Sequence, residues 1–103
     1  MFVRVVEPGK SGFQLRKGED GLSVFDLEVV DPALTEDEIL ANFRPGNVLD
    51  VRSREEIEAK GLRIIYVAGG DSLPPRLRAA HAEIRPLLTM SRGQFKQALK
   101  ELE

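Results

Sequence analysis

Alternating apolar and polar positions mark short candidate strands along the chain. Four stretches rich in β-branched and aromatic residues fit this pattern: Phe2–Val6, Gly21–Phe25, Asn47–Arg52 and Leu62–Ala68. Gly or Pro residues flank most of them, which is typical of strand ends. We therefore predict a sheet built from short strands.

A fifth stretch, residues 78–86, has the period of a strand and contains the only histidine of the chain. One face of this predicted strand carries small or apolar side chains, namely Ala80, Ala82 and Ile84. The other carries His81, Glu83 and Arg85, spaced about 7 Å apart by the rise of a strand. If that face borders a cleft, these groups are able to bind and polarise a substrate.

Three helices are predicted from their start signals and their apolar spacing. Thr35 with Glu38, Ser53 with Glu56, and Ser91 with Gln94 each have the spacing of a capping box. The first helix is expected to end near Phe43 and the second at Gly61. The last should bury a helical stripe of Phe95, Ala98, Leu99 and Leu102.

The segments between these elements are rich in glycine and proline. Residues 7–21 hold four glycines together with Lys10, Arg16 and Lys17, and a brief strand at 12–16 is expected within them. Their spacing matches no phosphate-binding motif, so a phosphate loop is only weakly indicated. A second loop is predicted from Gly69 through Pro75.

Length and composition predict one domain spanning residues 1–103. No signal peptide or membrane-spanning run is visible, so we expect a cytoplasmic protein, or one exported without a cleaved signal. The chain has no cysteine, which excludes disulfides and thiolate metal sites, and one histidine excludes a histidine-rich metal site within one chain. No metal is therefore expected.

Charge is distributed unevenly. Residues 1–50 carry 5 basic and 10 acidic residues, net −5, whereas residues 51–103 carry 10 and 7, net +3. The basic excess gathers in a few side chains: Arg76, Arg78, Arg85, Arg92 and Lys96. These could attract a phosphate-bearing ligand, but they are too sparse and too poor in aromatic neighbours to indicate nucleic-acid binding.

The mixture of strands and helices lacks the regular alternation of a parallel βαβ fold. We therefore predict the α+β class, with a small, mostly antiparallel sheet and two to three helices.

The chemistry of the singled-out residues stays open at this level. His81 could be a structural histidine bound to a neighbouring carbonyl or carboxylate. Arg4 could be a charge that protects an edge strand from pairing with other chains. A triad of Ser23, His81 and an aspartate can be written, but no motif supports it.

Three blocks, in order, resemble the small ADP-ribosyltransferase-like toxins, which include effectors delivered by bacterial type VI secretion. They are Val3–Val6 with its arginine, Gly21–Asp26 with the sequence Gly-Leu-Ser-Val-Phe-Asp, and Ala80–Pro86 leading to Met90 and Phe95. The run Asp71–Pro75 also resembles the family. Together the blocks cover about a third of the chain.

The resemblance implies an ADP-ribosyltransferase-like split sheet with NAD held between its halves. It implies that Arg4 contacts the phosphates or the nicotinamide-side ribose, and that Ser23 bonds the ribose or supports the late-strand carboxylate. His81 or Glu83 would stabilise the positive charge that develops as nicotinamide leaves. The implied cofactor contacts are Arg4, Gly21, Leu22, Ser23, Phe25 and His81, and the implied catalytic residues are His81, Glu83 and Ser23.

The sequence and the resemblance lead to two main hypotheses of function from different classes, and to a third, lesser one. The first is an NAD-consuming bacterial toxin, either an ADP-ribosyltransferase or an NAD glycohydrolase, neutralised by a cognate antitoxin or immunity protein. The second is a non-enzymatic α+β interaction domain, antitoxin-like or an inactive family member, that binds an acidic partner through basic residues such as Arg76, Arg78 and Arg92. The third, lesser option is a small RNA-processing or translation-associated domain that uses the same basic residues.

Overall fold

The computed structural model describes every residue from Met1 to Glu103. It contains five strands, β1 (Phe2–Val6), β2 (Leu22–Asp26), β3 (Val48–Arg52), β4 (Leu62–Tyr66) and β5 (His81–Pro86). Four helices accompany them: α1 (Glu36–Leu40), α2 (Arg54–Ala59), α3 (Pro75–Ala80) and α4 (Arg92–Lys100). None of these helices has the length and apolar character needed to cross a membrane.

All five strands form one antiparallel open sheet in the order β3-β1-β2-β5-β4. The predicted α+β class and the mostly antiparallel sheet are thus confirmed. Because β1 lies between β3 and β2, Arg4 is not on an edge strand, and its interpretation as an edge-protecting charge is wrong.

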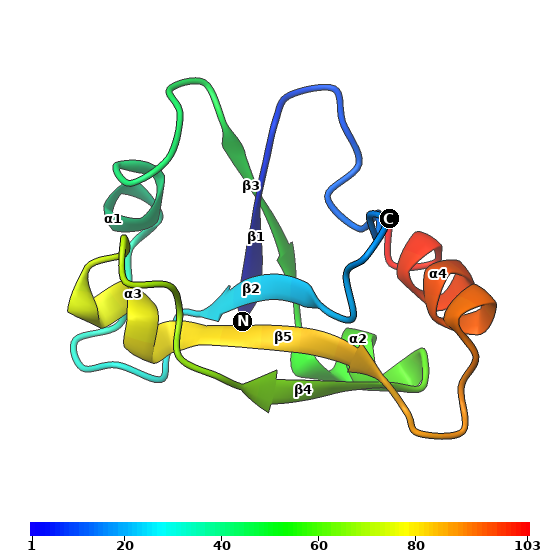
Figure 1. Cartoon of the computed structure of the whole chain (residues 1–103). Helices are drawn as coiled ribbons and strands as arrows, with labels where there is room; N and C mark the ends of the chain where they lie inside the picture. The colour runs from blue at the N-terminus through cyan, green and yellow to red at the C-terminus, as the bar shows by residue number, and fades with distance from the viewer.

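The sheet opens between β1 and β2. β1 pairs with β3 over its whole length, from Phe2 to Val6, but its register with β2 covers only Phe2 opposite Asp26 and Val3 opposite Phe25. Beyond Val3 the two strands diverge, and Figure 1 shows β1 and β3 running across the direction of β2, β5 and β4. The opening lies beside Arg4 and Ser23.

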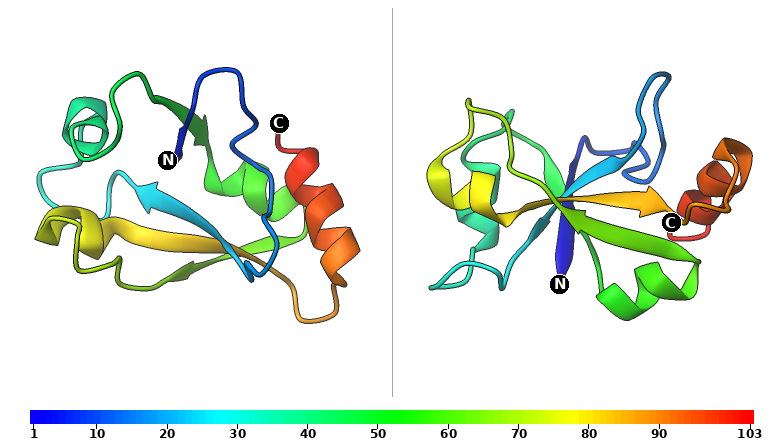
Figure 2. Two further views of the ribbon diagram at one scale, coloured as in Figure 1. Left: turned by 45° about the horizontal axis from the view of Figure 1, so that its top comes forward. Right: turned by 60° about the horizontal axis from the view of Figure 1, so that its bottom comes forward.

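Two apolar clusters pack on opposite faces of the sheet. The larger joins α2 and α4 to β2, β4 and β5, with Phe95, Leu99 and Ile57 fully or almost fully buried. The smaller joins α1 and α3 to β1 and β2, through Val3 and Phe25. Figure 2 shows α1 and α3 gathered at one end of the molecule and α2 and α4 at the other.

Helix α3 was not predicted from the sequence, so the expected two to three helices are in fact four. Arg78, Ala79 and Ala80 belong to α3, and the late strand begins only at His81. The helix has six residues and begins at Pro75, so it has too few turns to show a helical period, and its prolines resemble those of a loop. The brief strand expected at residues 12–16 is also absent, since this segment is irregular.

Two of the three predicted capping boxes are complete, at Ser53 and Ser91. At Thr35 only half forms: its hydroxyl accepts from the Glu38 backbone N–H at 3.1 Å. The Glu38 carboxylate instead accepts from Arg76 Nε at 2.6 Å and from its Nη2 at 3.3 Å, which ties α1 to α3. A tertiary ion pair has replaced the local cap.

The Glu38–Arg76 pair predicts a pH-dependent stability. Chiefly through the Arg76 hydrogen bond, the pKa of Glu38 is lowered from its usual value near 4.5. The folded state therefore binds this proton more weakly than the unfolded state, so the contribution exists above pH of about 4.5 and is lost as pH falls through the lower, folded pKa. We expect Glu38→Gln to have a lower Tm than wild type at pH 7, and the difference to shrink as the pH falls below about 4.5. Thermal melts across that range measure it, and a pH-independent difference would contradict the pairing.

Candidate functional site

A cavity of about 290 Å³ lies where β1 and β2 diverge. We call it the split cavity. It is lined by residues of three strands and two loops: Arg4, Val5, Ser23, Phe25, Phe43, Gly70, Ser72, Leu73 and His81. Four residues predicted from the sequence, far apart along the chain, therefore meet in one place.

Arg4 spans the opening between the two halves of the sheet. Its Nη1 donates to the Ser23 carbonyl at 2.8 Å, and its Nε donates to the Gly12 carbonyl. The guanidinium has five N–H donors, so three remain for other partners. No carboxylate forms an ion pair with it. Burial lowers the pKa of Arg4.

Gly12 lets the loop after β1 approach Arg4 closely. A Cβ added at Gly12 would lie 2.3 Å from Cγ1 of Val6 and 3.5 Å from Cγ of Arg4. A side chain at this position would therefore push the loop away, and the Gly12 carbonyl with it. This glycine positions an acceptor for the Arg4 guanidinium.

Ser23 and Phe25 reach the split cavity because they alternate on one face of β2. Ser23 is opposite Glu83 and Phe25 opposite His81 in the ladder with β5. The Phe25 and His81 rings pack edge to face, with centroids 5.8 Å apart. Phe25 is 5% exposed, so it forms the floor of the cavity, while Ser23 is exposed.

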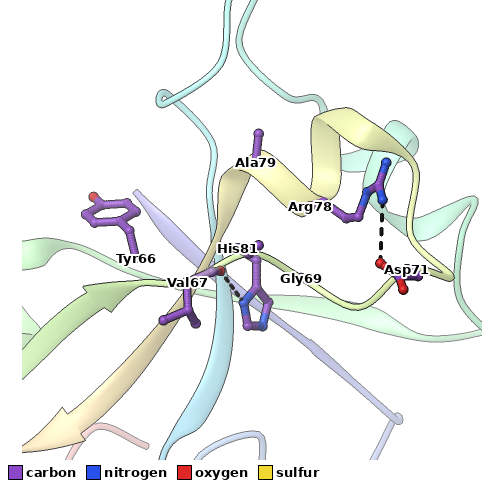
Figure 3. Close-up of a pocket in the computed structure, with 8 residues that line it drawn as sticks. Tyr66, Val67, Gly69, Asp71, Arg78, Ala79 and His81 are labelled. Atoms are coloured by element: carbon purple, nitrogen blue, oxygen red, sulfur yellow. Dashed lines mark hydrogen bonds and ion pairs between the residues drawn. The ribbon is translucent and has the colours of Figure 1, made fainter.

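His81 is held by the loop after β4. Its Nδ1 lies 2.9 Å from the Val67 carbonyl oxygen, and this contact is the dashed line beside His81 in Figure 3. A carbonyl can only accept, so Nδ1 carries a proton and, in the neutral ring, Nε2 is left as an acceptor. This arrangement agrees with the expectation of a histidine bound to a carbonyl, yet the ring still borders the split cavity.

His81 also borders a second cavity of about 400 Å³, whose lining residues are drawn in Figure 3. We call it the outer cavity, and Tyr66, Val67, Asp71 and Arg78 contribute to its lining. The loop is packed closely here, since a Cβ at Gly69 would lie 2.9 Å from Leu73 Cδ1 and 3.3 Å from His81 Cβ. His81 thus stands at the boundary of two cavities.

Glu83 lies on the same face of β5 but does not line the split cavity. Its Oε1 accepts from Nε and Nη2 of Arg85, at 2.8 Å and 2.5 Å. Gly21 packs against this pair: a Cβ added at this position would lie 3.1 Å from Glu83 Oε1 and 3.2 Å from Arg85 Cγ. Gly21 therefore makes room for Glu83 and Arg85 and is not part of the cavity lining.

The expected cofactor contact of Leu22 is wrong for its side chain. Leu22 is fully buried in the larger apolar cluster, on the opposite face of the sheet from Ser23 and Phe25. Successive side chains of a strand point to opposite faces, and here Leu22 points into the core while Ser23 lines the cavity. Leu22 packs into the core on one face of β2, and the other face of this strand lines the split cavity.

Sequence reasoning missed part of the lining. Phe43, expected only to lie near the end of the first helix, follows α1 and packs edge to face on Phe25 with ring centroids 6.1 Å apart. The other missed members are Val5, Gly70, Ser72 and Leu73. The last two fall in the Asp71–Pro75 run that resembles the toxin family, which was the available signal.

The geometry does not support the catalytic triad or a metal site. A triad of Ser23, His81 and an aspartate does not form, because Nδ1 of His81 bonds a carbonyl and no carboxylate lines the split cavity. No cluster of three metal-ligating side chains occurs in the structure.

The basic residues expected to bind an acidic partner are mostly engaged within the chain. Arg76 binds Glu38 and the Pro32 carbonyl, and Arg92 donates to the Glu19 and Arg16 carbonyls at 2.6 Å and 2.9 Å. Arg78 lies 3.7 Å from Asp71.

Comparison with known protein families, with curated proteins and with solved structures found no match for this chain.

The contact at Gly12 predicts opposite effects for two alanine substitutions. Gly12→Ala should destabilise the fold by about 1–3 kcal/mol, because the added methyl group collides with Val6. Gly93→Ala is the matched control: it lies in α4 with no atom closer than 4.0 Å to an added Cβ, so it should stabilise by about 0.5–1 kcal/mol. Urea unfolding of both variants measures the difference, and equal effects would refute the proposed role of Gly12.

Proposed function

We propose that this protein cleaves NAD at the bond between nicotinamide and ribose, as an ADP-ribosyltransferase or an NAD glycohydrolase. One observation carries the proposal: Arg4, Ser23, Phe25 and His81, which the family resemblance implicates, line one cavity at the opening of the sheet. They come from three strands, and no local sequence motif would bring them together. The opening between β1 and β2 also fits the split sheet that the resemblance implies.

Arg4 would bind the phosphate groups or the nicotinamide-side ribose. It is partly buried, lacks a carboxylate partner and retains three free donors. A planar guanidinium bonds phosphate oxygens in pairs, and such charge-assisted bonds are about twice as strong as neutral ones.

The nicotinamide end would lie against Phe25 and Phe43, whose edge-to-face rings form an apolar wall. Val5 and Leu73 extend this wall and limit the access of water. An aromatic wall suits a planar ring, and excluding water strengthens the electrostatic interactions inside the site.

In the proposed step, the bond from ribose C1′ to the nicotinamide nitrogen breaks, and both electrons leave with the neutral nicotinamide. Positive charge develops on the ribose until water or an acceptor group forms a bond to C1′ and releases a proton. His81, through Nε2, and the Ser23 hydroxyl would hydrogen-bond the ribose hydroxyls and favour this charged state.

His81, rather than Glu83, is the stronger candidate for the role on β5. Glu83 is engaged by Arg85 and stands outside the cavity, whereas His81 lines it. Glu83 would then act on the site indirectly, as a cross-strand neighbour of Ser23.

A toxin of this kind would be neutralised by a cognate antitoxin or immunity protein, and we include that partner and the toxin role in the proposal. The alternative of a purely non-enzymatic binder has less support, because Arg76 and Arg92 are used inside the fold. Neither would be readily available to an acidic partner.

The test is nicotinamide release from NAD by purified protein. We expect wild type to release nicotinamide, and His81→Ala to lower kcat about 10²–10³-fold through loss of a hydrogen bond that favours the charged transition state. Arg4→Ala should lower kcat/KM about 100-fold, as expected for a lost charge-assisted contact of roughly 3 kcal/mol. Lys60→Ala, which removes an exposed cation at the end of α2, is the control and should match wild type.

Circular dichroism of each variant would separate lost chemistry from lost folding. If wild type releases no nicotinamide and NAD at millimolar concentration does not shift its Tm, the enzyme proposal is wrong. If Glu83→Ala abolishes turnover while His81→Ala retains it, the proposed assignment on β5 is wrong.

A further inference from the structure

A polar cavity adjoins the split cavity across Arg4. This loop cavity, of about 460 Å³, lies between β1 and the loop that follows it. The two cavities share three lining residues: Arg4, Val5 and Phe43. A ligand longer than the split cavity could therefore continue past Arg4 into the loop cavity.

Two arginines without ion-pair partners face the loop cavity. Arg4 donates only to backbone carbonyls, and the Arg16 side chain, which also lines the cavity, forms no ion pair in the structure. The neighbouring Lys10 is different, since its Nζ lies 2.8 Å from Glu7. The free positive charge of this cavity therefore resides in the two guanidinium groups.

These two groups repel each other across the cavity. Burial has the largest effect on Arg4 and lowers its pKa. The Glu19 carboxylate raises this pKa, and Arg16 lowers it with a smaller effect. Two like charges facing one polar space are relieved by an anion placed between them. A phosphate-bearing ligand would supply that anion.

Arg16 is held in position by the C-terminal helix. Arg92, the first residue of α4, donates to the backbone carbonyls of Arg16 and Glu19, at 2.9 Å and 2.6 Å. The Arg16 N–H donates to the Glu19 carboxylate at 2.7 Å, and Leu15 beside it is buried in the larger apolar cluster. The backbone that carries the guanidinium is thus ordered before any ligand binds, which lowers the entropic cost of binding.

We propose that Arg4 and Arg16 together bind the pyrophosphate of a dinucleotide, whose nicotinamide end occupies the split cavity and whose adenosine end enters the loop cavity. The inference rests on the proposed function and adds to it a residue, Arg16, and a ligand preference. A mononucleotide would occupy one cavity and use one arginine, whereas a dinucleotide uses both.

Isothermal titration calorimetry with ADP-ribose and with nicotinamide mononucleotide tests the proposal. We expect Arg16→Ala to weaken ADP-ribose binding about tenfold or more and to leave nicotinamide mononucleotide binding unchanged, since only the longer ligand reaches Arg16. Arg16→Lys should recover part of the loss, because a lysine retains the charge without the paired geometry.

Lys17→Ala is the matched control, because it removes an adjacent cation that lines neither cavity. It should bind both ligands as wild type does. If Lys17→Ala weakens ADP-ribose binding as much as Arg16→Ala, the effect is long-range charge and the proposed contact is wrong. Equal losses for both ligands in Arg16→Ala would also overturn it.

The experiments distinguish a failure of the Arg16 contact from a failure of the proposed NAD cleavage. Nicotinamide release by wild type, with an unchanged KM for NAD in Arg16→Ala, would overturn the Arg16 contact and leave NAD cleavage in place. Absence of binding of either ligand to wild type at millimolar concentration would overturn both.

Discussion

The Arg4 guanidinium is the interaction on which the arrangement of this molecule depends. Where the pairing of β1 with β2 stops, backbone carbonyls lose their ladder partners, and a carbonyl without a donor is costly when it is shielded from water. Arg4 donates to the carbonyl of Ser23 on β2 and also to the carbonyl of Gly12 in the loop. One side chain therefore bridges the opening, supplies donors to the backbone there and presents charge to the cavity. Arg4 therefore contributes both to the stability of the fold and to the candidate site.

Local signals made much of the fold predictable. The serine caps of α2 and α4 were correct because capping is decided within four residues. At Thr35 the same signal was half wrong, since Glu38 found a better partner in Arg76, which lies far along the chain. The position of β1 inside the sheet could not be predicted either. Strand order is decided by contacts between distant segments, and the sequence of β1 alone is compatible with an edge or an inner strand.

The candidate site was predictable to the extent that strand alternation determines it. The period of two correctly places Ser23 and Phe25 on one face, opposite Glu83 and His81, and the same rule shows why Leu22 faces the core. Alternation also placed Glu83 beside His81, but it could not show that Arg85 would bind its carboxylate. Phe43 escaped prediction because it follows a helix and reaches the cavity only through the packing of α1.

The opening of the sheet should also couple ligand binding to stability. A partly buried guanidinium without a carboxylate ion-pair partner is an unfavourable arrangement in the free protein, chiefly because burial opposes its ionised form. Glu19 favours the ionised form, and Arg16 opposes it with a smaller effect. An anionic ligand would remove that penalty only in the folded state, since the unfolded chain has no cavity. Its binding energy therefore adds to the free energy of unfolding, by about 2.7 kcal/mol at a ligand concentration one hundred times Kd. The charge that makes this region costly without a ligand is the same charge that would make it stable with one.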